Sequence, residues 1–206
     1  MTVLTISREF GAGGRTLGKW VAKELGYTLV DEDIVQMVAE RAKVSKKTVK
    51  SMEKEAGGSL LRFMNYLISQ KQINRLLEDH RGYLDEEVYV NTLTQIITDL
   101  AKEGNCVIVG RGGQYVLREH ADAFHLLLVA NHEDRVRFMM ETYNITKDQA
   151  TNTIRVHGKR RHNLYRKFGK EDYDDPLLYH LVLNMSKLSM EKATETSIKL
   201  VKGGGN

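Results

Sequence analysis

The sequence predicts an α/β protein, a three-layer fold with a parallel sheet and a phosphate-binding loop. The first reason is an apolar, β-prone run at 3–6 that meets a glycine cluster at 11–14, after which apolar residues recur at helical spacing. The second reason is that apolar runs at 106–109 and 124–129 alternate with helical patterns further along the chain. This alternation is typical of a parallel sheet that carries helices on both faces.

The remaining elements follow from hydrophobic periodicity and from the positions of glycine and proline. Further strands are expected at 27–30, 106–109, 124–129 and 179–184. Helices are expected from the glycine loop to Leu25 and at 34–42, 86–102, 133–141, 146–170 and 189–201, with a broken helical stretch at 44–80. Thr146 and Gln149 stand at capping-box spacing, which marks the start of the longest helix.

The composition fits one globular domain. Of the 206 residues, 41% are hydrophobic and 28% charged. No apolar run approaches the ~20 residues needed to cross a bilayer, so we expect no membrane partner. Arg8 and Glu9 interrupt the N-terminal apolar segment, which argues against a signal peptide. The single cysteine, Cys106, suits a reducing compartment. We therefore expect one domain over 1–206 in the cytoplasm, with Cys106 at a buried strand position.

The glycine loop has the composition of a phosphate cradle. Glycines let a backbone turn its N–H groups inward, and the N-terminus of the following helix adds partial positive charge. We expect the backbone of the loop to hold a polyphosphate and the Thr16 hydroxyl to hold Mg²⁺. The loop residues are Phe10, Gly11, Ala12, Gly13, Gly14 and Arg15. The alternative is a glycine-rich strand-to-helix turn in another kind of α/β protein.

The loop departs from the usual phosphate-loop pattern of Gly, four residues, Gly, Lys and then Ser or Thr. Arg8 stands at the first glycine, and Gly14 stands at the lysine. Arg15 is the first candidate to replace the lysine, because arginine donates hydrogen bonds in a fork that fits phosphate oxygens. Arg8 is the second candidate.

Two more candidate residues follow predicted strands, at the sheet edge where open α/β sheets bind ligands. Arg111 lies in a Gly-Arg-Gly-Gly run directly after 106–109. We expect it to face the same site as the glycine loop, although an ordinary turn with a solvated arginine has the same sequence. Asp33 ends an acidic run after 27–30 and fits both a substrate contact and the N-cap of the next helix.

The formal net charge of +4 suits an anionic ligand. The strongest basic cluster lies in the longest helix and includes aromatic residues: Lys159, Arg160, Arg161, Tyr165, Arg166, Lys167 and Phe168. This mixture fits nucleic-acid binding, a set of arginines that converge on a phosphate, or a solvated helix face. We expect a small-molecule ligand and consider nucleic acid the weakest of the candidate partners.

Four motifs together resemble the cytidylate kinase-like family, which is related to the nucleoside monophosphate kinases. They are ISREFGAGGRTLGK, CVIVGRGG, the arginine-bearing segment 159–169 and YHLVLNMSKLS, and the likeness runs in order from Thr5 to about Val201. The resemblance implies a phosphate-loop core with a helical acceptor-side region at about 31–95 and an arginine-bearing lid at about 150–172. It also implies ATP and Mg²⁺ as cofactors and a small acceptor of phosphate.

The resemblance also suggests roles for the arginines. Arg15 is expected to stand in for the lysine beside the transferred phosphate, and Arg111, with Arg8 as a second candidate, to bind the acceptor phosphate. In the lid, three arginines are candidates to close over the γ-phosphate, namely Arg160 with Arg161 or Arg166. Positioning of the two phosphates and offsetting of their charge are the main tasks in phosphoryl transfer.

Four departures from the family pattern leave the acceptor open. Cytidylate kinases have lysine where Gly14 stands and aspartate where Gly112 stands, and His157 and His180 occupy places expected to be acidic. The leading hypothesis is therefore an ATP-dependent phosphotransferase that acts on a nucleoside monophosphate, such as CMP, or on another small acceptor. The alternative is a nucleotide-binding sensor or regulatory protein that has lost catalysis.

Overall fold

The computed structural model describes residues 1–31, 86–168 and 173–203. In these ranges five strands form one parallel sheet in the order β2-β3-β1-β4-β5. The strands are β1 Val3–Arg8, β2 Thr28–Val30, β3 Cys106–Val109, β4 Ala123–Val129 and β5 Leu181–Asn184. The predicted parallel sheet is confirmed, with each strand close to its expected position.

The helices of the described ranges also match the expected ones, with two additions. They are α1 Gly14–Leu25, α6 Glu86–Glu103, α7 Gly113–Val116, α8 His132–Tyr143, α9 Lys147–Lys167, the 3-10 helix η1 Pro176–Leu178 and α10 Met190–Gly203. Both bonds of the capping box between Thr146 and Gln149 are present. Only α7 and η1 were not predicted, because each is too short to show a hydrophobic periodicity. The expected helix at 34–42 and the stretch at 44–80 lie outside the described residues.

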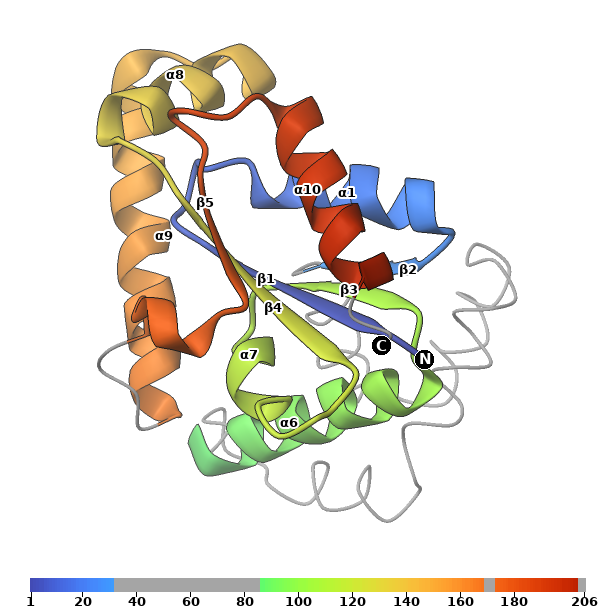
Figure 1. The fold of residues 1–206 in the computed structure, drawn as a ribbon. Coiled ribbons are helices and arrows are strands. Elements are labelled where there is room, and N and C mark those ends of the chain that lie inside the picture. The colour runs from blue at the N-terminus through green and yellow to red at the C-terminus, as the bar shows by residue number, and fades with distance from the viewer. Residues whose placement is uncertain (32–85, 169–172, 204–206) are drawn as a thin grey trace, which may run out of the picture.

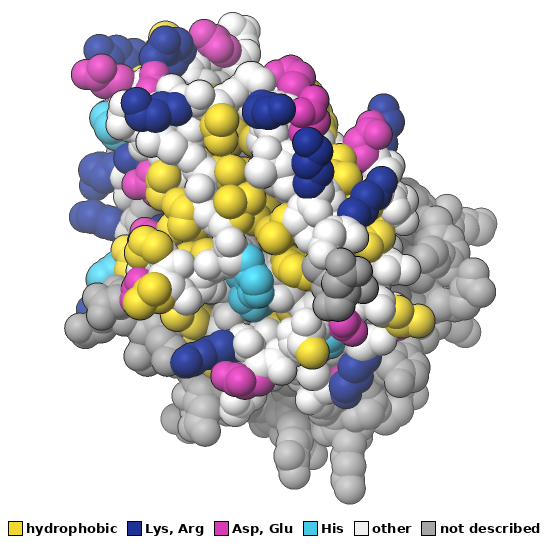
Figure 2. Space-filling model, in the orientation of Figure 1, with side chains coloured by type: hydrophobic (Ala, Val, Ile, Leu, Met, Phe, Trp, Pro, Cys, Tyr) yellow, Lys and Arg dark blue, Asp and Glu magenta, His cyan; other side chains and the backbone are white. Residues whose placement is uncertain are grey.

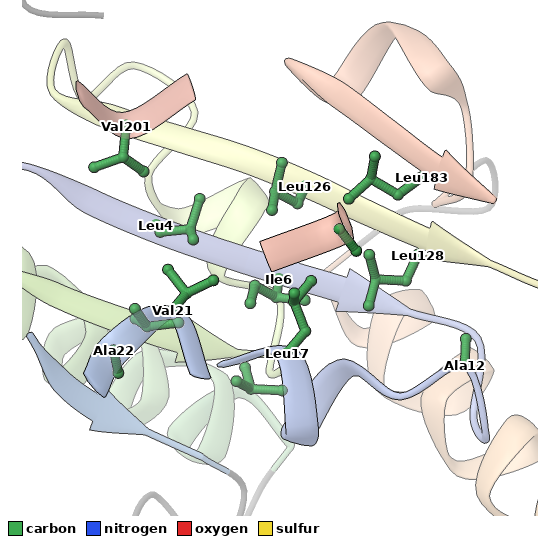
Figure 3. Close-up of a cluster of buried hydrophobic side chains, with 13 residues drawn as sticks. Leu4, Ile6, Ala12, Leu17, Val21, Ala22, Leu126, Leu128, Leu183 and Val201 are labelled. Carbon is green, nitrogen blue, oxygen red and sulfur yellow. The ribbon is translucent and has the colours of Figure 1, made fainter. Parts of the chain in front are cut away.

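The layers are visible in Figure 1, where α1 and α10 cover one face of the sheet and α6 and α7 cover the other. Helices α8 and α9 stand on the side where β1 and β4 end. The hydrophobic cluster under α1 and α10 contains Leu4, Ile6, Leu17, Leu126 and Val201, among others (Figure 3). The cluster on the opposite face joins α6 to the other side of the same strands. No helix of the described ranges is long and apolar enough to span a membrane.

The central strand, β1, is buried on both faces. Val3 pairs with Cys106 of β3 and with Ala123 of β4, so β1 has a hydrogen-bonded neighbour on each side. Its residues from Val3 to Ser7 are all buried. A continuous apolar run is the usual character of a strand at the centre of a parallel sheet. The loop that follows β1 therefore starts from a fixed point in the core.

Gly18 allows α1 to pack closely against the sheet. A Cβ atom at Gly18 would lie 2.8 Å from Cγ2 of Val109 and 3.3 Å from Cδ1 of Leu29. Both contacts are with strands, and Val109 is almost fully buried, so it has little free space to move into. Glycine is a poor helix former, and its presence at this position is explained by the close approach of helix to sheet.

Cys106 lies at the start of β3, as predicted, and only 2% of its surface is exposed. Burial, with the negative charge of Glu103 as a second cause, raises the pKa of its thiol to about 12. The thiol is therefore protonated at neutral pH, and nucleophilic chemistry requires the thiolate. The sulfur lies 3.8 Å from the carbonyl oxygen of Leu100, a weak hydrogen bond.

A buried polar cluster lies within the sheet at His125 of β4. Its Nδ1 atom is 2.7 Å from the hydroxyl oxygen of Thr5, and its backbone N–H donates to Nδ1 of His180 at 3.1 Å. Burial is the main cause that lowers the pKa of His125 to about 4, and the nearby His180 lowers it further. His125 is therefore neutral at physiological pH.

We predict that alanine has opposite effects at two helical glycines. At Gly18 the new methyl group collides with Val109, so Gly18→Ala should lower the free energy of unfolding by about 1–3 kcal/mol. Gly158, in α9, has open space around its Cα, so Gly158→Ala should raise it by about 0.5–1 kcal/mol through helix propensity. Urea denaturation of both variants checks this, and stabilisation by Gly18→Ala would contradict the close approach.

The neutral His125 predicts a loss of stability in acid. Its pKa is about 4 when folded and 6.5 in the absence of the fold, so between these pH values only the unfolded chain takes up the proton. The free energy of unfolding should fall as the pH decreases from about 6.5 to 4, by about 3 kcal/mol from this group alone. Denaturation curves at pH 7, 5.5 and 4 should show a smaller decrease for His125→Gln than for the wild type. An equal decrease in both would remove His125 as the cause.

Candidate functional site

The glycine loop between β1 and α1 leaves the first turn of α1 without a cap. Gly11 and Gly13 have φ angles of 91° and 83°. Gly13 is the N-cap of α1 and offers no side chain to the first N–H groups, and the first turn contains no acidic residue. These N–H groups have no acceptor within their own helix, and together with the helix dipole they favour an anion. The strand, glycine loop and helix that the sequence predicted are present.

The loop is anchored from the side of β4 and α8. The carboxylate of Glu9 accepts a hydrogen bond from the Ala130 N–H at 2.8 Å, and the Glu9 N–H donates to the Leu128 carbonyl at 3.0 Å. Arg135 of α8 donates to the Phe10 carbonyl at 3.3 Å. The anchoring contacts of Glu9 and Arg135 were not predicted from the sequence, because neither residue stands in a pattern that marks a phosphate loop.

Arg15 points toward β2. Its guanidinium forms an ion pair with Asp31, at 2.9 Å between Nη2 and Oδ2. Asp31 follows β2 directly, and its side chain is only 8% exposed, against 47% for that of Arg15. This contact joins the first turn of α1 to the end of β2. The role of Arg15 as a replacement for the lysine stays a prediction.

Arg8, the last residue of β1, lies across the start of α1. A Cβ atom at Gly14 would be 2.8 Å from Cγ and 3.1 Å from Cδ of Arg8. At the other end of the side chain, a Cβ atom at Gly110 would be 3.0 Å from Cζ and would overlap Nη1. The side chain therefore extends from the first residue of α1 to the residue that follows β3, and both neighbours are glycines.

The backbone after β3 is unusual. Gly110, Arg111 and Gly112 have φ angles of 79°, 59° and 76°, so three consecutive residues are left-handed. For the non-glycine residue Arg111 this conformation costs about 1–2 kcal/mol. The ring of Phe168 closes the loop from α9, since a Cβ atom at Gly112 would lie 2.8 Å from its Cε2. Strained residues of this kind cluster at functional sites, which supports the predicted importance of Arg111.

The three arginines expected in the lid face different ways. Arg160 and Arg166 are exposed on α9, together with Arg155 and Lys159, and Figure 2 shows Lys and Arg side chains along this side of the molecule. Arg161 points inward, and its side chain is only 13% exposed. The structure therefore does not bring the three arginines together.

Arg161 is held by hydrogen bonds and aromatic rings. It forms an ion pair with Asp174, donates to the Ser7 hydroxyl at 3.1 Å, and lies 5.0 and 4.8 Å from the ring centroids of Tyr165 and Tyr173. Burial opposes its charge, but hydrogen bonding to Asp174 and the electrostatic effect of Tyr165 outweigh burial and hold its pKa above the ordinary value. Arg161 is therefore charged, and its charge is balanced inside the protein.

Helix α9 also contacts the glycine loop and the end of β1. The ring of His157 stacks on Phe10, with centroids 4.1 Å apart and planes at 13°. The hydroxyl oxygens of Tyr165 and Ser7 are 3.2 Å apart, and Tyr165 is almost completely buried. Residues 150–168 of the expected lid thus pack along the site in this structure, and its function as a lid stays a prediction.

The structure says less about the other two predicted binding residues, Thr16 and Asp33. Thr16 lies in the first turn of α1 and is partly exposed. Within the described ranges, no group of three or more His, Cys, Asp and Glu side chains is arranged to hold a metal ion. Asp33 lies outside the described residues. The role of Thr16 as a ligand of Mg²⁺ stays a prediction.

We predict that neighbouring arginines of α9 differ sharply in their effect on stability. Arg161→Met removes the hydrogen bonds to Ser7 and Asp174 and the contacts with two rings, so it should lower the free energy of unfolding by about 2–3 kcal/mol. Arg160→Met, on the exposed side of the same turn, should change it by less than about 0.5 kcal/mol. Urea denaturation of the two variants measures the difference, and equal values would show that Arg161 does not hold α9.

Comparison with solved structures concerns the fold. Among solved structures, an uncharacterized protein from Eubacterium ventriosum ATCC 27560 gives a TM-score of 0.68 at 18% identity, over 98% of both chains. A gluconokinase from Sinorhizobium meliloti 1021 gives 0.51 at 10% identity, over 98% of this chain and 92% of its own. A shikimate kinase from Bacteroides thetaiotaomicron gives 0.47 at 16% identity, over 98% and 96%. At these identities the likenesses concern the fold alone.

The sequence comparison is more specific. No curated protein matches the sequence. The model of the cytidylate kinase-like family matches residues 3–187, which include the glycine loop, the loop after β3 and the whole of α9. A match over most of the chain confirms the family that the four sequence motifs suggested. The chain belongs to the cytidylate kinase-like family.

Proposed function

We propose that the protein is an ATP-dependent phosphotransferase that transfers the γ-phosphoryl group to a nucleoside monophosphate, such as CMP, or to another small acceptor. The observation that carries the proposal is the uncapped N-terminus of α1 behind a glycine loop at the end of the central strand. This arrangement fits a polyphosphate. Membership of a kinase-like family supports the same activity, and the buried, protonated Cys106 suits the proposed cytoplasmic location.

The loop residues fit the donor nucleotide. The positive φ angles of Gly11 and Gly13 turn the backbone, and a side chain at Gly11 would collide with Arg135. In the proposal, the N–H groups of 10–15 bind the β-phosphate and the hydroxyl of Thr16 holds Mg²⁺. The ion would supply positive charge between the phosphates when it is bound.

The acceptor and the transferred group need further positive charge. We assign the acceptor phosphate to Arg111, whose strained backbone holds it directly after β3, and an acceptor contact to Asp33. Arg160 and Arg166 lie on the exposed side of α9. Their proposed contact with the γ-phosphate therefore requires α9 to change its position, as lids do in other kinases. Arg161 contributes in the same way only after it leaves Asp174.

A catalytically inactive nucleotide sensor is the second candidate. It is favoured by the glycines at positions 14 and 112, where cytidylate kinases have lysine and aspartate. In that case the loop binds nucleotide and the response is transmitted through contacts such as the stacking of His157 on Phe10. The two candidates share the binding site and differ only in turnover.

We predict Mg²⁺-dependent turnover of ATP with a small acceptor. The test is a coupled assay of ADP formation with ATP and Mg²⁺ against a panel of nucleoside monophosphates, nucleosides and small metabolites, with ATP binding measured by calorimetry in parallel. Arg111→Ala should raise the KM for the acceptor about tenfold or more, since it removes a charged contact with phosphate. Lys19→Ala, on the exposed side of α1, is the matched control and should change neither constant.

The outcomes separate the candidates. ATP binding together with turnover of one acceptor supports the phosphotransferase. Tight ATP binding without turnover of any acceptor supports the sensor. Absence of ATP binding, with binding of single-stranded oligonucleotides that weakens steeply as salt increases, would overturn both in favour of nucleic-acid binding.

A further inference from the structure

We infer that the guanidinium of Arg8 takes the place of the phosphate-loop lysine and binds the transferred phosphoryl group. The inference deepens the proposed function and rests on it. It starts from two of the positions at which the loop departs from the usual pattern, which lie six residues apart in the sequence. Position 8 carries an arginine where the pattern has glycine, and position 14 carries a glycine where the pattern has lysine.

The structure connects the two positions sterically. A Cβ atom at Gly14 would lie 2.8, 3.1 and 3.2 Å from Cγ, Cδ and Cβ of Arg8. The contact at Cβ involves the part of Arg8 that cannot move without the backbone. A side chain that starts at position 14 therefore needs the space that the stem of Arg8 already fills. Arginine at position 8 therefore requires glycine at position 14, and the two departures from the usual pattern depend on each other.

The far end of Arg8 lies at a second glycine. Gly110 has a φ angle of 79°, and a side chain at this position would collide with the guanidinium. The cation is thereby directed along the carboxyl edge of the sheet, from the first turn of α1 toward the loop that contains Arg111. A phosphoryl group that passes from the α1 terminus to an acceptor at Arg111 has to cross this edge.

The competing candidate is oriented differently. Arg15 lies one residue beyond Gly14 and forms its ion pair with Asp31 at the end of β2. The strand order places β2 at the edge of the sheet, two strands from β1. Between the two arginines, Arg8 is the one that starts on the central strand and follows the loop.

An arginine in this position has chemical consequences. A guanidinium donates several hydrogen bonds in one plane and can grip two phosphate oxygens at once, whereas the lysine ammonium is a point charge. It also starts from a buried strand rather than from a helix terminus, so its stem has fewer conformations to lose on binding. The preference for a nucleoside triphosphate over a diphosphate should therefore depend on Arg8.

The experiment separates charge, volume and position. Arg8→Met keeps most of the stem and removes the charge, while Arg8→Lys keeps the charge and removes the fork. The double variant Arg8→Gly, Gly14→Lys restores the first glycine and the lysine of the usual pattern, and Arg8→Gly and Gly14→Lys are made singly for comparison. Binding of ATP and of ADP with Mg²⁺ is measured by calorimetry, turnover by the coupled assay, and folding by thermal denaturation.

The expected result for Arg8→Met is a loss of ATP affinity of ~10-fold or more, with ADP affinity changed by less than ~3-fold, and a loss of turnover of ~10²-fold or more. Arg8→Lys should recover part of the ATP preference. Gly14→Lys alone should be impaired, because its side chain collides with Arg8. The double variant should bind ATP better than either single variant, and Lys19→Met is the control that should match the wild type.

Three outcomes overturn the inference. The first is an unchanged ATP preference in Arg8→Met, and the second is a double variant that is no better than Arg8→Gly. The third is a loss in Arg15→Met that Arg8→Met does not show, which would assign the role to Arg15. In all three the wild type still binds ATP, so the proposed function survives. A folded wild type that binds neither ATP nor ADP overturns the proposed function, and the inference with it.

Discussion

The burial of β1 at the centre of the sheet is the constraint on which the rest of the structure depends. Its pairing with β3 and β4 fixes where the strand ends relative to both neighbours. Because of that register, Arg8 reaches Gly110 after β3, and Glu9 reaches Ala130 after β4. A slip of one residue would turn every side chain of β1 to the opposite face. The geometry of the loop is therefore a consequence of the core.

Helix α9 and the residue that follows it contact the glycine loop, the end of β1 and the loop after β3. His157 contacts the loop, Arg161 and Tyr165 contact Ser7, and Phe168 closes over Gly112. The buried charge of Arg161 is balanced by Asp174. An incoming phosphate would have to compete with a carboxylate for the same guanidinium. In the proposed function, ligand binding and the position of α9 would therefore be coupled through Asp174.

Most of the fold could be predicted from the sequence, because buried strands and amphipathic helices carry strong periodic signals. The short α7 and η1 carry none. The loop was recognisable from its glycines, but the dependence of Arg8 on Gly14 requires the path of a side chain through space. Spacing in α9 likewise did not decide which of Arg160 and Arg161 faces inward, since both stand in the same run of basic residues.

The state of Cys106 makes the protein suitable for site-directed labelling. The thiol is buried and protonated, and the chain has no other cysteine. Maleimide reagents require an accessible thiolate, so the native chain should give almost no background. A cysteine introduced on the exposed side of α9 would then carry a spin label or fluorophore alone. Distances from such a probe to a second one on α1 would report directly whether the helix moves when nucleotide is added.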